Sequence, residues 1–559
     1  MQALIRPLEE LAEFEELQKT KTGRPGMIQI SGCVNSQKTH MMYALSDGCH
    51  YKVIACSSES KAKQIYEEYR FLDPNTYLYP AKDLLFYQAD LRSRELVKQR
   101  MEVIQAVISG QAMTVVTSFD GFMDALLPKE EIQRRTITVR NDSAVDLSKM
   151  EKELAGLGYD REVQIEGPGQ FAVRGGILDV YPLTEELPVR IELWGDEVDS
   201  IRTFDVGTQR SIENLEEVVI YPASEFPEEG EQRVSFLDYF ERERTLLFLD
   251  EPVRLLEKGK GVEDEFLEAQ KRRLESGYDI TDAEAQLYHT DEIVRRMNGY
   301  SSIGFFALEM RSRGLDVRGS VSLMTKSVNP YNSSFDMLTQ DLKRLKRNGY
   351  RVVLLSGSRT RARRLAEDLR DYNLSSYYSD EMDREVASGE IMTAYGHVAE
   401  GYEYPMLKFT VIAETDIFGK VKKKKKRKSY EGRKIQSFSE LKPGDYVVHE
   451  NHGLGIYQGI EKIEVDKVAK DYMKISYAKG GNLYIPATQL DLIQKYASAD
   501  AKKPKLNRLG TQEWTKTKKK VRGAVKEIAR DLVALYAARQ EQEGYVYGAD
   551  TVWQQEFEE

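Results

Sequence analysis

The sequence predicts a multidomain protein of mixed α/β and β class. Its 559 residues exceed what one hydrophobic core organises. Hydrophobic residues make up 41% and charged residues 31% of the chain, the balance of an ordinary folded protein. Short β-rich runs beside helical patterns give way to long stretches of strand-like alternation broken by glycine turns. These changes of pattern predict α/β domains and β-rich domains in one polypeptide.

The front of the chain predicts an α/β domain that is interrupted by a β-rich insert. Tyr51–Ser57 and Ala112–Ser118 are β-rich runs, and Ser93–Ile108 has helical spacing. From about Val163, apolar and polar residues alternate between Gly-Gly and Gly-Asp turns, which predicts antiparallel strands. The α/β pattern returns at Thr245–Pro252. An inserted β-rich module inside one α/β domain explains this order.

The rear predicts a second small α/β domain, a linker, a small β-barrel and a long final helix. Val352–Leu355 is an apolar strand, and Leu365 and Leu369 share one face of the helix after it. The basic run Lys422–Lys428 predicts a solvated linker, because like charges repel and no apolar residue is available for a core. Glycine-rich alternation then predicts about five strands. The predicted boundaries are 1–150 and 231–318 for the two parts of the first α/β domain, 151–230 for its insert, 319–418 for the second α/β domain, 419–436 for the linker, 437–509 for the barrel and 510–559 for the helix.

Charge and cysteine content restrict the class of partner and the compartment. The net charge is −10, yet residues 501–530 hold eleven Lys/Arg against two Asp/Glu, so the acidic surplus lies towards the front. An acidic surface favours protein partners over a phosphate backbone. Only three cysteines occur, at spacings that fit neither a disulfide framework nor a zinc site. No apolar run reaches the roughly eighteen residues of a membrane span, and the start lacks a signal-peptide pattern. We therefore expect a cytoplasmic protein with no bound metal and no membrane contact.

A P-loop-like turn is the most informative short motif. Gly32-x-x-x-x-Gln37-Lys38-Thr39 matches the phosphate-binding pattern except that Gln37 replaces the second glycine. That glycine lets the backbone N–H groups wrap closely around a phosphate, and a side chain there adds steric cost. Lys38 and Thr39 retain the chemistry to contact phosphate and magnesium. The pattern favours a relic P-loop that is structurally intact but catalytically idle.

A second motor-like motif, LLFLDEP, is altered in the same way. Four apolar residues lead into Asp250 and Glu251, which resemble the magnesium-holding and water-polarising acids of a Walker B strand. Pro252 removes a backbone donor directly after this pair. Two altered motifs together favour a retired ATPase domain.

Two candidate protein-binding surfaces lie in the β-rich segments. Arg190 and Trp194 are an even number of residues apart, so they share one face of an extended strand, and Arg174 precedes the neighbouring turn. Arginine and tryptophan are frequent interface anchors, although a solvated arginine beside a core tryptophan explains the residues equally well. In the barrel, a cluster near an exposed turn suggests an edge strand that adds to a partner's sheet, with simple core packing as the alternative; its members are Ile456, Ile460 and Ile463.

Five long strings together resemble bacterial transcription-repair coupling factors: YPAKDLLFYQADLRSREL, GQFAVRGGILDVYP, RIELWGDEVDSIRTFDVGTQRS, LKPGDYVVHENHGLGIYQG and LYIPATQLDLIQKY. The resemblance covers essentially the whole chain and corresponds to the N-terminal part of the family. It implies a front similar to the excision-repair protein UvrB, with an insert that binds UvrA through Arg174, Arg190 and Trp194. It also implies a Tudor- or CarD-like barrel that docks on the β subunit of RNA polymerase, with Ile463 at a family contact position.

The same resemblance implies a function that couples transcription to nucleotide excision repair. In the family, an ATP- and magnesium-dependent translocase on double-stranded DNA follows these domains, and its motifs do not occur in this sequence. We therefore expect no cofactor and no small-molecule substrate for the chain itself, and no role is implied for 319–418. Two alternatives remain open. One is a weak ATPase or helicase that uses Lys38 and Asp250, and the other is a stand-alone CarD-like transcription regulator.

Overall fold

The computed structural model describes residues 2–520 with several gaps and divides the chain into two compact units, Met1–Ser429 and Tyr430–Glu559. The residues outside the description are 1, 83–93, 166, 207, 228–229, 276–286, 311–312, 420–440, 450–451, 466–467, 487–492, 497–503, 510–512, 515, 518–519 and 521–559. The predicted basic linker and most of the predicted final helix therefore lie outside the described residues. Within the described residues, no helix is both long and apolar enough to cross a membrane.

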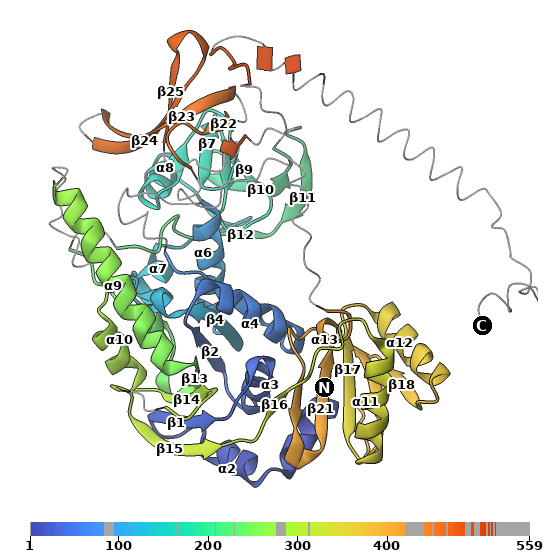
Figure 1. Cartoon of the computed structure of the whole chain (residues 1–559). Helices are drawn as coiled ribbons and strands as arrows, with labels where there is room; N and C mark the ends of the chain where they lie inside the picture. Colours follow the sequence, from blue (N-terminus) through green and yellow to red (C-terminus); the bar gives the residue numbers. More distant parts are fainter. Residues whose placement is uncertain are drawn as a thin grey trace, which may run out of the picture. The chain divides into compact units, whose positions relative to one another are not determined.

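The first unit is organised around a seven-stranded parallel sheet with the order β15-β1-β14-β13-β2-β4-β3 (Figure 1). Its strands are β1 (Gly26–Ser31), β2 (Tyr51–Cys56), β3 (Thr76–Tyr79), β4 (Met113–Ser118), β13 (Thr245–Asp250), β14 (Ser301–Phe306) and β15 (Val317–Ser322). The main helices are α2 (Ala12–Thr20), α3 (Asn35–Leu45), α4 (Glu59–Leu72), α6 (Arg94–Ile108), α9 (Pro252–Glu275) and α10 (Thr290–Met297). The predicted strands at 51–57, 112–118 and 245–250 are confirmed as three neighbours in this sheet.

Both faces of this sheet are buried along its inner strands, as parallel sheets require, whereas the edge strand β15 is partly exposed. Successive strand residues alternate between two hydrophobic cores, so that Leu247 and Leu249 belong to one core and Leu246 and Phe248 to the other. A strand buried on both faces has a continuous apolar sequence, which is why LLFL was recognisable as a strand. The sheet therefore separates two cores within the first unit.

The β-rich insert forms a six-stranded sheet with the order β11-β10-β9-β8-β7-β6. Its strands are β6 (Asp160–Arg161), β7 (Gln170–Arg174), β8 (Ile177–Tyr181), β9 (Val189–Trp194), β10 (Glu197–Phe204) and β11 (Ser211–Leu215). All neighbours pair antiparallel except β6 and β7. One face packs into a core with helix α8 (Leu147–Gly156). A two-stranded sheet of β5 (Ile137–Arg140) and β12 (Glu217–Ile220) also contributes to that core.

The second α/β sheet has the order β16-β20-β21-β17-β19-β18. Its strands are β16 (Lys326–Ser327), β17 (Arg351–Ser356), β18 (Ser376–Ser379), β19 (Ile391–Tyr395), β20 (Tyr402–Tyr404) and β21 (Phe409–Ala413), with helices α11 (Phe335–Arg347), α12 (Arg359–Asp371) and α13 (Glu414–Phe418). The predicted buried strand at Val352–Leu355 and the buried helix face at Leu365 and Leu369 are confirmed. Along β17, Val352 and Leu354 face a core of their own, whereas Val353 and Leu355 belong to a core that the first sheet also contributes.

The second unit is a five-stranded antiparallel sheet with the order β25-β24-β23-β22-β26. Its strands are β22 (Tyr446–His449), β23 (Gly453–Val465), β24 (Val468–Ser476), β25 (Asn482–Pro486) and β26 (Ile493–Lys495). The strand β22 pairs with β23 only from Gly453 to Ile456. From Gln458 onward, β23 pairs with β24 alone among the strands that the structure describes. Among the described strands, this part of β23 therefore has one edge without a partner strand, which we call its open edge.

Candidate functional site

Lys38 does not project into open space but into a clamp of two carboxylates. Its Nζ donates to Oδ1 of Asp250 at 2.8 Å and to Oε1 of Glu251 at 2.6 Å. Burial acts to lower the pKa of Lys38, but Asp250 and Glu251 together outweigh it and raise the pKa. The lysine is therefore a buried, charged partner of the acids at the end of β13, and only 6% of it is exposed.

Both the backbone and the side chain of Glu251 are held by hydrogen bonds to neighbouring residues. Its backbone has a φ of +53°, and its N–H donates to the carbonyl of Phe305 at 2.9 Å. The carboxylate oxygen that accepts from Lys38 also accepts from the N–H of Ala307 at 2.8 Å. Pro252 directly after it begins α9, a position where proline is tolerated because no helical partner is needed for its nitrogen. The two Walker B-like acids therefore accept hydrogen bonds from Lys38 and from the backbone of Ala307.

From Ser36 onward, the residues of the P-loop-like motif are buried. Gln37 and Thr39 are inside the protein, and Oε1 of Gln37 accepts from the N–H of Val34 at 3.3 Å. Gly32 has a φ of +80°, which favours glycine. In this arrangement the lysine and both acids are paired with one another. The motif residues assemble as predicted, but around protein groups.

In the insert, Arg174 and Arg190 are brought together by Asp179, which the sequence did not single out. Nε and Nη2 of Arg190 donate to the two carboxylate oxygens of Asp179 at 2.7 and 2.9 Å. Nη2 of Arg174 donates to the same carboxylate at 2.5 Å. Asp179 is 1% exposed, so it is a buried anion satisfied by two cations. It stands opposite Arg190 in the β8–β9 pairing, a contact that a hairpin register would have predicted.

Arg190 is held on further sides, whereas Trp194 is free. The Arg190 guanidinium lies 4.4 Å from the ring centroid of Phe204, and its Nη2 donates to Gln209 at 3.0 Å. Trp194 ends β9 and is 85% exposed. Arg190 and Trp194 occupy alternate positions of β9, as predicted, on the face opposite the insert's main core. The insert therefore presents an exposed tryptophan on the same face as a pair of arginines held by one aspartate, which we call the Arg/Trp face (Arg174, Arg190 and Trp194).

The three isoleucines of the small sheet do not form one cluster. By register, Ile456 pairs with Ser476 and Ile460 with Met473, which lie an odd number of residues apart. They therefore face opposite sides of the sheet, because a bulge between Tyr457 and Gly459 shifts the alternation. Ile460 is 37% exposed on the open-edged part of β23. Ile463 pairs with Lys470, and its side chain lies outside the described residues.

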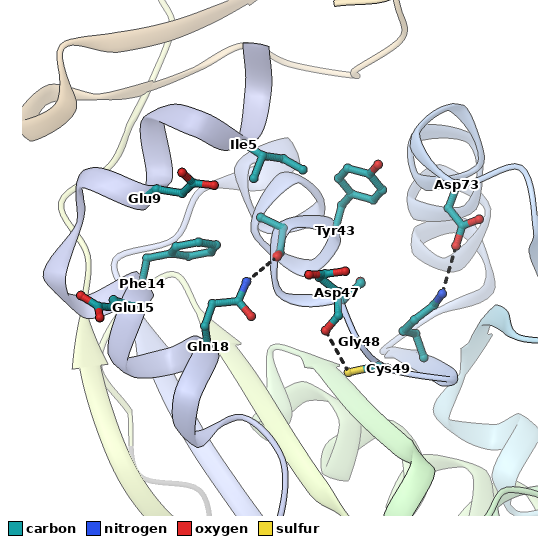
Figure 2. A pocket seen from close by; sticks show the side chains of 13 residues that line it. Ile5, Glu9, Phe14, Glu15, Gln18, Tyr43, Asp47, Gly48, Cys49 and Asp73 are labelled. Atoms are coloured by element: carbon teal, nitrogen blue, oxygen red, sulfur yellow. Dashed lines mark hydrogen bonds and ion pairs between the residues drawn. The ribbon is translucent and has the colours of Figure 1, made fainter. Parts of the chain in front are cut away.

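A cavity of about 640 Å³ lies where the N-terminal helices meet the end of α3 (Figure 2). Its lining includes Phe14 and Tyr43 and four carboxylates, and it shares no residue with the Lys38 clamp. Three of the carboxylates already pair with Arg6, Lys19 and Lys52. The described residues contain no group of three or more His, Cys, Asp or Glu that could hold a metal ion. We assign no ligand to this cavity.

Both β-rich modules match domain families of known proteins. Residues 137–226 match the UvrB interaction domain, and residues 441–497 match the CarD-like/TRCF RID domain. The transcription-repair-coupling factor of Bacillus subtilis (strain 168) is 32% identical over 546 residues, covering 87% of this chain and 46% of that protein. The chain is a homologue of transcription-repair-coupling factors. The factor of Staphylococcus haemolyticus (strain JCSC1435) is 31% identical, covering 86% of this chain and 46% of that protein.

The resemblance stated from the sequence is thereby confirmed. The chain spans slightly less than half the length of the curated transcription-repair-coupling factors it matches. The Arg/Trp face lies within the matched UvrB interaction domain, and β23 lies within the matched CarD-like domain.

Proposed function

We propose that this chain couples transcription to nucleotide excision repair by binding two proteins, UvrA and RNA polymerase, through separate modules. The observation that carries the proposal is the pair of domain matches, one on the insert and one on the small sheet, within a single homologue of transcription-repair-coupling factors. The two modules belong to different compact units of the chain. Two sites on one polypeptide raise the local concentration of one partner near the other.

We assign UvrA binding to the Arg/Trp face. Its support is geometric, since Asp179 fixes both guanidinium groups while Trp194 stands almost fully exposed. A large apolar surface next to directional donors is the usual composition of an interface hot spot. Because Arg190 is committed to Asp179, Gln209 and Phe204, we expect Arg174 and Trp194 to make the direct contacts. Arg190 then has an indirect role, because it fixes the Asp179 carboxylate that also holds Arg174.

We assign polymerase binding, with the β subunit as the contact, to the open edge of β23. The N–H and carbonyl groups of such an edge can pair with a strand of a partner, and neighbouring apolar side chains add specificity. Ile460 is exposed on this stretch, and Ile463 follows three residues later. Ile456 lies before the bulge, where β22 pairs with β23 through Tyr446, and is the weaker candidate. We assign no ATP hydrolysis and no DNA translocation to these residues.

A two-variant binding experiment tests the proposal. Arg174→Ala combined with Trp194→Ala is expected to abolish UvrA binding and to leave polymerase binding unchanged. Ile463→Arg is expected to do the reverse, because it places an unpaired charge in an apolar contact. Both are measured by calorimetry or surface plasmon resonance with purified UvrA and purified RNA polymerase.

Matched controls come from the same two sheets. Ile212→Ala changes another exposed apolar residue of the insert, on β11, and is expected to bind UvrA normally. Tyr484→Ala changes an exposed residue of β25, away from the open edge, and is expected to bind polymerase normally. Loss of both partners in either test variant, or binding of neither partner by the unaltered chain, contradicts the two-site assignment.

A further inference from the structure

We propose that the carboxyl-terminal edge of the first sheet, where a P-loop protein holds phosphate, now binds the second α/β domain and the chain that leads into it, residues 323–418. In this proposal the surviving P-loop residues join two sheets into one rigid body. The proposal is independent of UvrA and polymerase binding, and it gives a role to a domain for which the sequence implied none. Four sets of contacts carry it.

The first contact closes the start of the P-loop-like turn. The N–H of Leu323 donates to the carbonyl of Ser31 at 2.9 Å, and Oγ1 of Thr325 donates to the carbonyl of Gly32 at 2.6 Å. A β-carbon at Gly32 would lie 2.0 Å from the carbonyl oxygen of Leu323. The chain that leads from β15 to the second sheet therefore crosses directly over this turn. Glycine is required here by a neighbouring backbone.

The second contact occupies the start of α3, the helix end that holds phosphate in a P-loop protein. The side-chain amide of Asn35 donates to the carboxylate of Glu400, and Oγ of Ser36 accepts from the N–H of Glu400 at 3.2 Å. The same Ser36 hydroxyl donates to Glu68 at 3.0 Å, and Glu68 also accepts from the N–H of Ala399 at 3.2 Å. A carboxylate of the second domain thus lies beside the first residue of this helix.

The third contact uses the residue that departs from the P-loop pattern. Nε2 of Gln37 donates to the hydroxyl of Tyr404 at 2.9 Å. Nε2 of His40 lies 2.9 Å from the carbonyl of Leu4, so that nitrogen carries the proton, and Nδ1 accepts from the Tyr404 hydroxyl at 3.0 Å. All three side chains are fully buried and mutually satisfied. A glycine at position 37 could not reach Tyr404, so the departure from the motif builds the joint.

The fourth contact is an apolar core that both sheets share. It contains Ile28 and Ile30 from β1 and Val353, Leu355 and Val411 from the second sheet. Residues of α3 and α4 fill the same core, including Met41, Met42, Ala62, Ile65 and Tyr69. The polar contacts at the turn therefore lie at the margin of a continuous hydrophobic contact. Burial of apolar surface gives this joint its strength, and the polar contacts fix its register.

The proposal makes an unusual prediction about repair of the motif. Gln37→Gly restores the P-loop consensus, yet we expect it to bind no Mg-ATP, because Leu323, Glu400 and the Lys38 clamp still fill the site. We expect it instead to loosen the joint. Amide hydrogen exchange in residues 36–44 and 399–404 should become about three- to tenfold faster, the effect of losing one buried hydrogen bond.

The test uses the full chain with two further variants. Tyr404→Phe keeps the buried ring but removes the hydroxyl, so it should speed exchange in the same two segments without disturbing the fold. Gln133→Gly places the same substitution at an exposed position of helix α7 (Lys129–Arg135) and should leave both segments unchanged. Titration of each variant with Mg-ATP is followed by calorimetry. Micromolar Mg-ATP binding by Gln37→Gly, or unchanged exchange in both Gln37→Gly and Tyr404→Phe, overturns the proposal.

Discussion

At the scale of single residues, the most consequential side chain on the proposed UvrA face is one that makes no outward contact. Asp179 is buried on the same face of the sheet as Arg174 and Arg190 and pairs with both of them. The sequence allowed prediction of both arginines, because arginine and tryptophan are frequent anchors. It gave no reason to select one buried aspartate among the many acidic residues, because its role depends on a cross-strand pairing.

We predict that Asp179→Asn weakens UvrA binding at least tenfold, which is about 1.4 kcal/mol. The neutral amide cannot satisfy two guanidinium groups, so Arg174 loses its fixed orientation. Calorimetric titration with UvrA measures the effect, and circular dichroism verifies that the insert remains folded. Asp199→Asn alters an exposed aspartate of β10 and serves as the control. Equal affinities of Asp179→Asn and the unaltered chain would refute the positioning role.

His40 gives the joint between the two α/β sheets a pH dependence. Burial lowers the pKa of His40 from 6.5 to about 4, and the groups that face it are the Tyr404 hydroxyl, the Leu4 carbonyl and the rings of Tyr402 and Phe409. The unfolded chain binds this proton at a higher pH than the folded chain does. Stability from this group is therefore complete above pH 6.5 and is lost as the pH falls towards 4.

We predict that this loss amounts to about 3 kcal/mol between pH 6.5 and 4 and disappears in His40→Gln, which keeps a hydrogen-bonding side chain but has no ionisable group. Urea unfolding of both proteins across this range measures the difference in the free energy of unfolding. His397→Gln, at an exposed histidine, is the control and should follow the unaltered chain. Parallel curves for His40→Gln and the unaltered chain would exclude His40 as the source.

At the scale of elements, Lys38 fastens α3 to the end of β13. We predict that Lys38→Met destabilises the chain by about 3–5 kcal/mol, because it leaves Asp250 and Glu251 side by side without a buried cation. Thermal unfolding measures the loss. The double variant Lys38→Met with Asp250→Asn removes one of the two charges and should recover part of it. A Lys38→Met protein as stable as the original would show that the clamp has no structural role.

Elements were predictable from the sequence to the extent that their patterns are local. The strand LLFL and the helix carrying Leu365 and Leu369 follow from periodicity, and both formed as expected. The separation of Ile456 and Ile460 onto opposite faces did not follow, because a bulge in β23 shifts the alternation of its side chains. The contact between Gln37 and Tyr404 joins residues 367 positions apart, which no local pattern encodes.

At the scale of the whole molecule, the chain combines one large unit built on two α/β sheets and the insert with a second unit built on a five-stranded sheet. The shared core ties residues 319–418 to the front of the chain, although the sequence pattern predicts a separate domain there. The two proposed partner sites fall in different units. This division is the reason that the two test variants of the binding experiment are expected to act independently.

The crowded backbone at Gly32 bears on how genomes are annotated. A pattern search counts Gly32, Lys38 and Thr39 as survivors of an ATPase and ranks the chain as a weakened enzyme. Yet mutation of Gly32 would be selected against for the sake of a carbonyl group almost three hundred positions downstream, with no nucleotide involved. The presence of a glycine at this motif position is therefore explained by backbone packing alone and is not by itself evidence of nucleotide binding.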